Sequence, residues 1–475
     1  MDQEAGGKLV YYQSSNLNVY GVQPFGGERV VITFGSYLTP GDDGRGFAEA
    51  FLYKYRIDAI HVVPRSNSWF QYPDISAALA VVVAQTAGYA RRIAYGSSMG
   101  GYAAINFSDH LEVDRVIAIS PQFSIDPAKM PDDPRWRHAA ERIRFIRDNI
   151  AGLEKRGARQ IYAIYDNRHE LDAQQVARIA QSVDMIAVPA PFAGHPAGGM
   201  LVEAGLLSGM VRQLIDDAFD VEVFAAEYAA AAPQTAAYNA SLATVLPANR
   251  LEDRLRAARR AVAMQPASPV YRHLLSHLLG EAGAHEEAVA ILRELAERNN
   301  AIPELHHALA LALERAGRLA EAVAASRAGL ALAPDSPTLW ALLGRLLDDA
   351  GEGDEAEDCL RRAIGLAPGT AATAFRLSRL LAHQGRQHEA LSLAIAAVNN
   401  APDRAHYHAH IARLYLAVRN WREAEAGFER AVRLDPRTAL FLRLGIIRLR
   451  QGRAAAALDA ARLALLTLLG SRRHQ

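Results

Sequence analysis

The chain has 475 residues, more than one ordinary hydrophobic core holds, so two or three domains are expected. Its 52 basic and 52 acidic residues balance, which excludes the overall positive field of general nucleic-acid or anionic-membrane binders. Cys359 is the one cysteine, and this excludes a disulfide framework and a CxxC metal site. Neither a membrane-spanning apolar run nor a secretory signal is apparent, so the sequence predicts a cytoplasmic bacterial protein.

Up to about residue 215, short apolar runs rich in Val, Ile and Tyr alternate with helical stretches. Nearly continuous apolar runs are typical of strands that are buried on both faces. Strands separated by helices predict a mostly parallel α/β sheet. The expected strands are Leu9–Gln13, Val30–Phe34, Ala59–Pro64, Arg92–Ser97, Arg115–Ser120, Gln160–Tyr165 and Asp184–Ala190.

Residues 96–100 read G-S-S-M-G, a G-x-S-x-G motif between an expected strand and an expected helix. A serine at such a turn is held on a strained backbone, with its hydroxyl above the edge of the sheet. The hydroxyl becomes a nucleophile when a histidine takes its proton and a carboxylate orients that histidine. Here Asp166 ends a later strand and His195 follows the last one, so both lie where ligand sites of α/β sheets form.

This constellation resembles the α/β-hydrolase family over roughly residues 8 to 215. The family order of serine, acid and histidine is matched by Ser98, Asp166 and His195, so the resemblance implies a serine hydrolase with this triad. The family often places the acid a few residues beyond its strand. Asp172, and then Glu170, therefore remain alternatives to Asp166.

The resemblance also implies an oxyanion hole, in which two backbone N–H groups face the developing negative charge. Met99 is expected to supply one N–H group and Ser36, in the turn after Val30–Phe34, the other. The interval between residues 120 and 160 carries four prolines and then an expected helix toward residue 150, so any cap over the site is small. The expected substrate-binding residues are Gly35, Tyr37, Arg65 and Trp69, of which Trp69 is equally well explained as a packing residue.

The second half of the chain is helical and repeats every 34 residues. Three residue classes keep this period, which makes the repeat specific. The alanines are Ala288, Ala322, Ala356, Ala390 and Ala424; the small residues are Ser276, Ala310, Gly344, Ser378 and Ala412; and the prolines include Pro334, Pro368, Pro402 and Pro436.

This pattern resembles the tetratricopeptide repeat, a helix–turn–helix unit whose copies stack into a solenoid. Five repeats extend from about 269 to 438, and a degenerate one precedes them from about 235. A sixth is shortened by one residue, with Gly445 and Ala457 in the matching places. The resemblance puts the ninth repeat position on the concave face, where this chain has Arg345, Arg379 and Arg413. Three guanidinium groups suit the carboxylates of an acidic peptide, although a solvated row is an equal interpretation.

We therefore expect an α/β-hydrolase domain over 1–220, a linker helix and degenerate repeat over 221–268, and a tetratricopeptide solenoid over 269–475. The expected reaction is cleavage of a small-molecule or carbohydrate acyl ester, or a thioester, through an acyl-Ser98 intermediate without cofactor or metal. Acyl transfer to another alcohol stays open. The repeats are expected to bind a protein or peptide, and the alternative is an interaction scaffold with a weak or inactive hydrolase domain.

Overall fold

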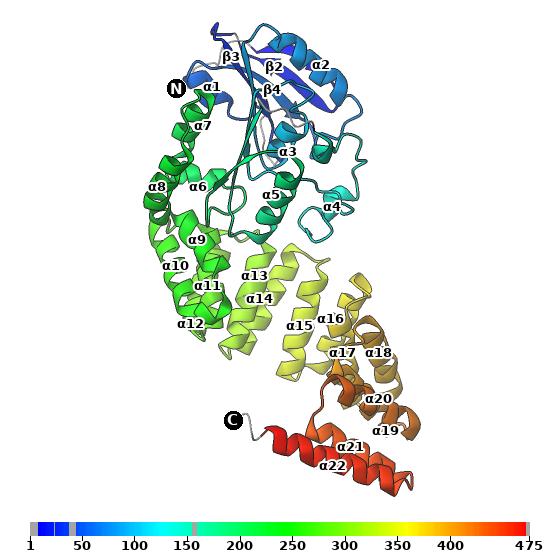
Figure 1. The fold of residues 1–475 in the computed structure, drawn as a ribbon. Coiled ribbons are helices and arrows are strands. Elements are labelled where there is room, and N and C mark those ends of the chain that lie inside the picture. The colour runs from blue at the N-terminus through cyan, green and yellow to red at the C-terminus, as the bar shows by residue number, and fades with distance from the viewer. Residues whose placement is uncertain (1–7, 23, 38–43, 154–158, 472–475) are drawn as a thin grey trace. The chain divides into compact units, whose positions relative to one another are not determined.

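The computed structural model describes residues 8–22, 24–37, 44–153 and 159–471. The chain divides into two compact units, Met1–Leu275 and Ser276–Gln475, and each is described by itself. Figure 1 shows the first unit as a sheet with helices around it and the second as a row of helices. Residues 221–268, expected as a linker and degenerate repeat, group with the first unit.

Among the described residues, the first unit contains an eight-stranded mixed sheet with the order β1-β2-β4-β3-β5-β6-β7-β8 (Figure 1). β1 pairs antiparallel with β2 and β2 with β4, whereas the strands from β3 to β8 run parallel. The strands are β1 (Leu9–Gln13), β2 (Leu17–Gly21), β3 (Arg29–Phe34), β4 (Asp58–Pro64), β5 (Arg91–Ser97), β6 (Arg115–Ile119), β7 (Gln160–Tyr165) and β8 (Ile186–Pro189).

The seven expected strands are present, and β2 is the strand that the sequence analysis missed. β2 has five residues and follows β1 through a turn in which Ser14 Oγ accepts hydrogen bonds from the amides of Asn16 (3.0 Å) and Leu17 (3.2 Å). The apolar run of β2 is short and is interrupted by Asn18, so its sequence does not predict a strand. Tertiary pairing with β4 supplies the stability that its local sequence lacks.

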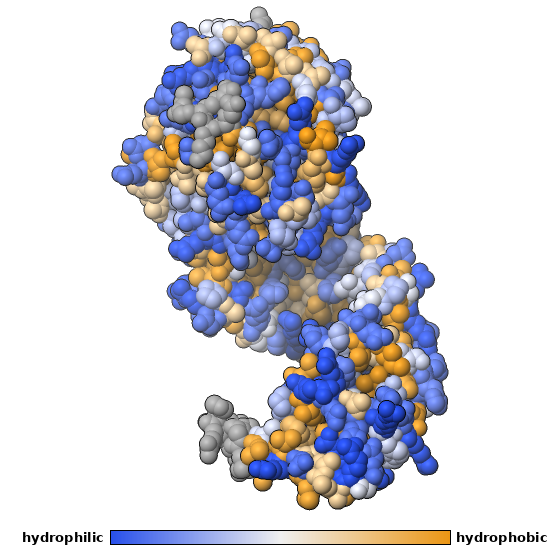
Figure 2. Space-filling view, turned by 45° about the vertical axis from the view of Figure 1, so that its right-hand side comes forward, coloured by the Kyte–Doolittle hydropathy of each residue, from blue (hydrophilic) through white to orange (hydrophobic). Residues whose placement is uncertain are grey.

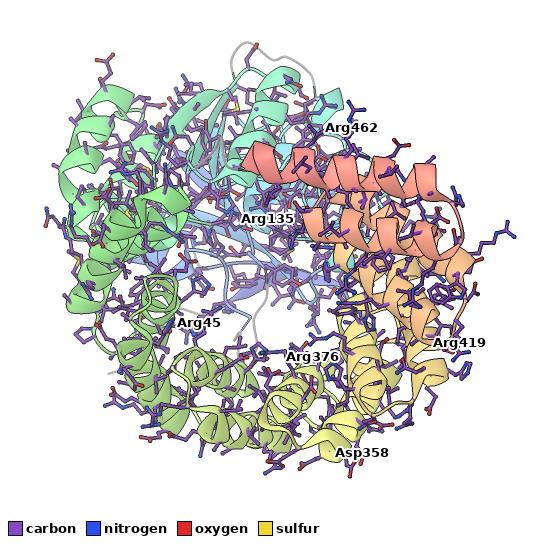
Figure 3. The ribbon with its side chains drawn as sticks, turned by 90° about the horizontal axis from the view of Figure 1, so that it is seen from below. Arg45, Arg135, Asp358, Arg376, Arg419 and Arg462 are labelled. Atoms are coloured by element: carbon purple, nitrogen blue, oxygen red, sulfur yellow. The ribbon has the colours of Figure 1, made fainter. Side chains whose placement is uncertain are left out.

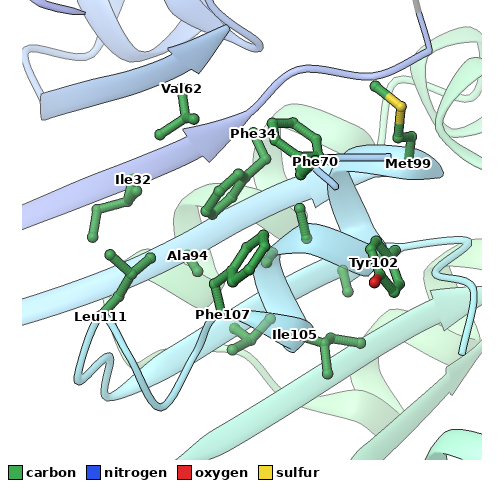
Figure 4. Close-up of a cluster of buried hydrophobic side chains, with 14 of the residues drawn as sticks. Ile32, Phe34, Val62, Phe70, Ala94, Met99, Tyr102, Ile105, Phe107 and Leu111 are labelled. Atoms are coloured by element: carbon green, nitrogen blue, oxygen red, sulfur yellow. The ribbon is translucent and has the colours of Figure 1, made fainter. Parts of the chain in front are cut away.

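Helices cover both faces of the sheet because side chains alternate along each strand. On one face, strand residues such as Ile32, Val116 and Ile161 form one core with α2 (Ile75–Thr86), α3 (Met99–Asn106) and α5 (Glu170–Ser182). Figure 4 shows this core around Phe34, Phe70 and Phe107. On the other face, strand residues such as Val31 pack against α1 (Glu49–Lys54), α6 (Gly198–Glu203), α7 (Leu207–Ile215) and α8 (Val221–Ala231).

The expected helix toward residue 150 is wrong. The interval contains the four-residue helix α4 (Arg137–Ala140) and the single 3₁₀ turn η1 (Ile150–Gly152), with irregular backbone between them. Gln71 Oε1 accepts hydrogen bonds from the amides of Ile146 (2.9 Å) and Arg147 (2.8 Å). These tertiary hydrogen bonds pair two N–H groups that would otherwise bond within a helix. The conformation of this segment is therefore set by its tertiary contacts and not by its local sequence pattern.

In the first unit α9 packs on α10, and in the second unit the helices from α12 to α22 pack in consecutive order, each on the next. Where two helices of a pair cross, a small residue is needed: a Cβ added to Gly344 would lie 3.1 Å from Ala356 O and 2.8 Å from Leu360 Cγ. The helices are η2 (Ala232–Gln234), α9 (Ala236–Val245), η3 (Ala248–Arg250), α10 (Leu251–Met264), α11 (Pro269–Glu281), α12 (His285–Arg298), α13 (Pro303–Arg315), α14 (Leu319–Leu332), α15 (Pro337–Ala350), α16 (Gly353–Leu366), α17 (Ala371–His383), α18 (Gln387–Asn400), α19 (Ala405–Ala417), α20 (Trp421–Leu434), α21 (Thr438–Arg450) and α22 (Ala454–Ser471).

The packing of α8 and α9 predicts where the chain can be cut. Phe224 and Tyr228 of α8 are buried against the sheet, and Glu203 accepts hydrogen bonds from the first amides of α9. A fragment of residues 1–283 should therefore fold as a unit. A fragment of residues 1–215 should melt at a lower temperature, because it exposes the apolar face under α8. Thermal unfolding by circular dichroism compares the two, and equal melting temperatures would contradict this packing argument.

Candidate functional site

Ser98 lies at the turn from β5 into α3, and the backbone of this turn is strained. Its φ of 53° and ψ of −117° fall in a region that residues other than glycine rarely adopt. A Cβ added to Gly96 would lie 2.2 Å from Gly100 O, and one added to Gly100 would lie 2.4 Å from Phe34 O. The glycines therefore let α3 begin directly against the end of β3, and the Ser98 side chain projects from the turn.

Three side chains from distant parts of the sequence form a hydrogen-bonded chain at this turn. Ser98 Oγ lies 3.1 Å from His195 Nε2, and His195 Nδ1 lies 2.8 Å from Asp172 Oδ2. Because a carboxylate only accepts hydrogen bonds, Nδ1 carries the proton, and the Nε2 of a neutral ring then presents its lone pair to Ser98. In this arrangement the imidazole can take the hydroxyl proton, so the serine can act as a nucleophile.

The acid in contact with the histidine is Asp172, the first alternative, and the choice of Asp166 is wrong in geometry. Asp166 accepts hydrogen bonds from the amides of Arg168 (2.8 Å), Phe192 (2.9 Å) and Gly194 (2.9 Å). It thus holds the loop that leads into His195. Asp172 lies in the first turn of α5, where the helix dipole favours a negative charge.

Asp172 is buried beside the Arg135 guanidinium and two imidazole rings. Arg135 Nη1 donates to Asp172 Oδ1 at 2.6 Å, and His169 Nδ1 lies 3.4 Å from the same oxygen. Burial by itself raises the pKa of Asp172, but the hydrogen bonds from His169, His195 and Arg135 and the charge of His195 outweigh burial and hold this pKa well below its usual range. The carboxylate is therefore ionised in the folded protein at neutral pH.

The same contacts tie Asp172 to the irregular interval after β6. Arg135 also pairs with Asp133 at 2.7 Å, and Asp133 accepts a hydrogen bond from Gln175 Nε2 at 2.9 Å. Gln175 Oε1 in turn accepts from the amide of Phe123 at 2.7 Å. No motif or period in the sequence marks Arg135, because it acts through tertiary contacts.

The two expected oxyanion donors come from turns that lie side by side. Met99 is the first residue of α3, so its N–H group has no partner within the helix. A Cβ added to Gly100 would lie 3.0 Å from Gly35 O, which puts the Gly35–Ser36 turn next to the start of α3. Ser36 Oγ donates to Ser97 O at 3.2 Å, which fixes the turn beside the nucleophile.

An aromatic cluster lies next to the histidine. The Trp136 ring is 6.3 Å from the His195 ring, 5.5 Å from Tyr37 and 5.3 Å from Trp69, measured between centroids. Trp69 is buried, so it packs beneath Trp136, whereas Tyr37 is exposed. Trp136 was missed by the sequence analysis because it stands in an interval without periodicity.

Arg65, the remaining expected substrate residue, has its guanidinium on Asn18 of β2, with Nη2 at 3.0 Å from Asn18 Oδ1. None of its described contacts joins it to the triad. The expectation for Arg65 therefore has no support in the geometry.

The three arginines of the concave row differ in their surroundings. Arg345 Nη2 donates to Glu314 Oε2 at 2.6 Å, so this charge is neutralised within the solenoid. Arg379 and Arg413 are exposed and have no ion pair among the described residues. Arg413 has a pKa lowered by partial burial and then by the like charges of Arg443 and Arg379, which stand on the first helices of the adjacent repeats. In Figure 3, Arg376, also from α17, points to the inner side of the row of helices, and Asp358 and Arg419 lie on the outer side.

Comparison with protein families matches the tetratricopeptide repeat at residues 273–337, 313–376 and 411–470. The second half of the chain carries tetratricopeptide repeats. Similar solved structures include MamA from Desulfovibrio magneticus RS-1, at 18% identity over 35% of this chain and 96% of that chain, with a TM-score of 0.34. TTC0263, a thermophilic repeat protein from Thermus thermophilus, is 22% identical over 38% of this chain and 100% of that chain, with a TM-score of 0.33.

YrrB, described as a tetratricopeptide repeat protein with an unusual peptide-binding site, is 20% identical over 39% of this chain and 96% of that chain, with a TM-score of 0.33. No curated protein matches the chain. Among the described residues, no helix combines the length and the apolar character needed to cross a membrane. The described part of the chain also contains no group of three or more His, Cys, Asp or Glu side chains arranged to hold a metal ion.

The lowered pKa of Asp172 makes a prediction for stability against pH. A carboxyl whose pKa is depressed by folding stabilises the protein above its unfolded pKa of about 3.9, and the stabilisation is lost as pH falls below that value. Asp172→Asn should therefore reduce the free energy of unfolding more at pH 6.5 than at pH 3. Urea denaturation at the two pH values measures this difference.

Glu170→Gln is the matched control, because it removes an exposed carboxylate from the same turn of α5. Its effect on the free energy of unfolding should be small at both pH values. An Asp172→Asn effect of equal size at pH 6.5 and pH 3 would contradict the role assigned to the Arg135 and histidine contacts.

Proposed function

We propose that the first unit is a serine hydrolase of the α/β-hydrolase type that cleaves an ester or thioester through an acyl-Ser98 intermediate. The observation that carries this proposal is the hydrogen-bonded chain from Ser98 through His195 to Asp172. The strained φ of Ser98 supports it, because such strain is found where the surrounding structure holds a functional group in place.

The chemistry follows from these positions. Ser98 Oγ attacks the carbonyl carbon of the substrate while His195 Nε2 takes the hydroxyl proton, and Asp172 stabilises the resulting imidazolium. The N–H groups of Met99 and Ser36 are directed at the oxyanion of the tetrahedral intermediate. His195 then returns the proton to the leaving alcohol or thiol. Water attacks acyl-Ser98 in a second round of the same proton transfers and releases the acid.

The aromatic cluster bears on the substrate class. Tyr37 and Trp136 give the site an apolar, aromatic wall beside His195. Such a wall suits the acyl chain of a small ester or the face of a sugar ring. We therefore favour a small-molecule or carbohydrate acyl ester, and an alcohol that binds this wall in place of water would turn the reaction into acyl transfer.

The second candidate function is an interaction scaffold in which the first unit has weak or no hydrolase activity. The family matches favour it, because they fall entirely on the repeats. Tetratricopeptide repeats imply a protein or peptide partner in either case. The two candidates differ in one property, which is the reactivity of Ser98.

Labelling with a fluorophosphonate probe tests that property, because the probe reacts covalently with activated serines. We expect a single adduct that maps to Ser98. Ser98→Ala should abolish labelling, whereas Ser97→Ala, the matched control at the preceding position, should leave it. A folded protein that does not react with the probe would support the scaffold function and contradict the hydrolase proposal.

Fluorophosphonate labelling and hydrolysis of a chromogenic short-chain ester also distinguish the two candidate acids, Asp172 and Asp166. Asp172→Asn should lower kcat by up to about 10⁴-fold, because the histidine loses the partner that fixes its tautomer. Asp166→Asn should cost less, because Asp166 only positions the loop, and part of its role passes to the amide oxygen. An active Asp172→Asn beside an inactive Asp166→Asn would reverse this assignment.

For the repeats, we propose that the concave face binds an acidic peptide or chain terminus. Arg379, Arg413 and Arg443 lie on the first helices of three successive repeats, and no acid within the described residues neutralises them. Guanidinium groups of like charge repel one another, and a partner carboxylate relieves that repulsion. Arg345 contributes less, because Glu314 already occupies it.

Arg379→Glu combined with Arg413→Glu should therefore abolish binding of an acidic peptide of about ten residues. The same double change at Arg422 and Arg430 of α20 is the matched control and should leave binding unchanged. Wild-type binding should weaken as salt rises from about 50 to about 500 mM, since the contact joins exposed charges. Fluorescence anisotropy of a labelled poly-glutamate peptide measures the affinities of the wild type and of the two double variants. Equal affinities of the two double variants would mean that the arginine row is a solvated face that does not bind the peptide.

A further inference from the structure

His169 is a second histidine on the triad acid, and the proposed reaction does not use it. Its Nδ1 atom accepts a hydrogen bond from the amide of Asp172 at 3.3 Å and so caps α5. The same Nδ1 atom lies 3.4 Å from Asp172 Oδ1. The ring of His169 is 6.3 Å from the ring of His195, measured between centroids. Two imidazoles therefore share the carboxylate of Asp172, and only one of them takes the serine proton.

The two contacts of His169 Nδ1 exclude each other, because they need the ring in different protonation states. A neutral ring that accepts from the Asp172 amide has its lone pair on Nδ1 and its proton on Nε2. A protonated ring carries a proton on Nδ1 as well, so Nδ1 can only donate, and Asp172 Oδ1 is an acceptor within reach. Uptake of a proton by His169 therefore replaces a helix cap with a charged hydrogen bond to the triad acid.

The charged and titratable groups that face His169 come from different parts of the first unit. They are Asp172 on its own helix, Asp166 directly after β7, Arg135 after β6 and His195 after β8. The hydrogen bond to Asp172 raises the pKa of His169 above its ordinary value, and the charges of Asp172 and Asp166 act in the same direction. Burial and the charge of Arg135 act against this rise but do not cancel it. His169 is therefore more than half protonated at its ordinary pKa, which is about 6.5.

The order in which the two rings take up protons follows from burial. The side chain of His169 is 31% exposed and that of His195 is 13% exposed, so a charge on His169 loses less hydration. In Figure 2, hydrophilic residues make up much of the visible surface of the first unit, and charges on such a surface are screened by solvent. A charge on His169 is screened less, because it faces the buried carboxylate of Asp172. Two like charges at this separation repel, so a proton on His169 opposes a second proton on His195.

We propose that His169 is a positioning residue that controls the triad through Asp172. Its protonation weakens the stabilisation that Asp172 gives to the imidazolium formed in the reaction, and it also keeps a proton from the solvent off His195. This inference rests on the proposed hydrolase function. As pH falls, the site should pass from full to reduced activity when His169 takes up a proton, and it should lose activity only when His195 is protonated as well.

His169→Asn tests this proposal, because asparagine keeps the cap of α5 but takes up no proton. The Cε1–H resonance of His195 in the full chain is followed by NMR as pH is varied. Its midpoint should lie higher in His169→Asn than in the wild type by on the order of one pH unit, since the repulsion between the two rings is removed. The pH profile of kcat/KM for a chromogenic short-chain ester should fall toward acid pH in two steps in the wild type and in one step in the variant.

His110→Asn is the matched control, because it removes an exposed histidine that follows α3, and it should leave both measurements unchanged. His169→Ala removes the cap as well as the proton, so it should titrate like His169→Asn and melt at a lower temperature. An unchanged His195 midpoint in His169→Asn, or a profile with as many steps as in the wild type, would overturn this inference alone. A wild-type chain that neither hydrolyses the ester nor reacts with a fluorophosphonate at any pH would overturn the hydrolase proposal and this inference with it.

Discussion

The close approach of backbone to backbone at the carboxyl ends of β3 and β5 is the constraint on which the candidate site depends. α3 can start beside the end of β3 only because Gly100 has no side chain, and the turn can close only because Gly96 has none. This approach fixes Ser98 at a positive φ and brings the Gly35–Ser36 turn next to the amide of Met99. Ser98 and the amides of Met99 and Ser36 are thus positioned by main-chain packing.

Two carboxylates next to this turn position His195 in different ways. Asp166 binds main-chain amides and fixes the loop, so its charge is used to hold backbone. Asp172 binds the imidazole itself, and it is kept ionised by Arg135 and by its place at the start of α5. Asp166 therefore holds the loop in position, and Asp172 orients the ring that this loop carries.

The same division explains what sequence reasoning could and could not predict. Ser98 and His195 carry local signals, because one lies in a G-x-S-x-G turn and the other follows the last strand. Asp166 and Asp172 are six residues apart after the same strand, and both are buried acids. The choice between them depends on where α5 begins and how the His195 loop folds back, and neither is encoded within a few residues. Trp136 and Arg135 were missed for the same reason, since tertiary hydrogen bonds shape their segment.

The repeats present the opposite case, because their contacts are between near neighbours in sequence. A period of 34 residues therefore sufficed to predict the helix pairs and their small crossing residues. What the period cannot predict is where a repeat departs from its own pattern. Arg345 looks equivalent to Arg379 and Arg413 in sequence, but Glu314 pairs with Arg345 alone of the three. In a repetitive protein, the residues that break the period at a structurally equivalent position carry the information about binding, because the period itself is already accounted for by the stacking of the array.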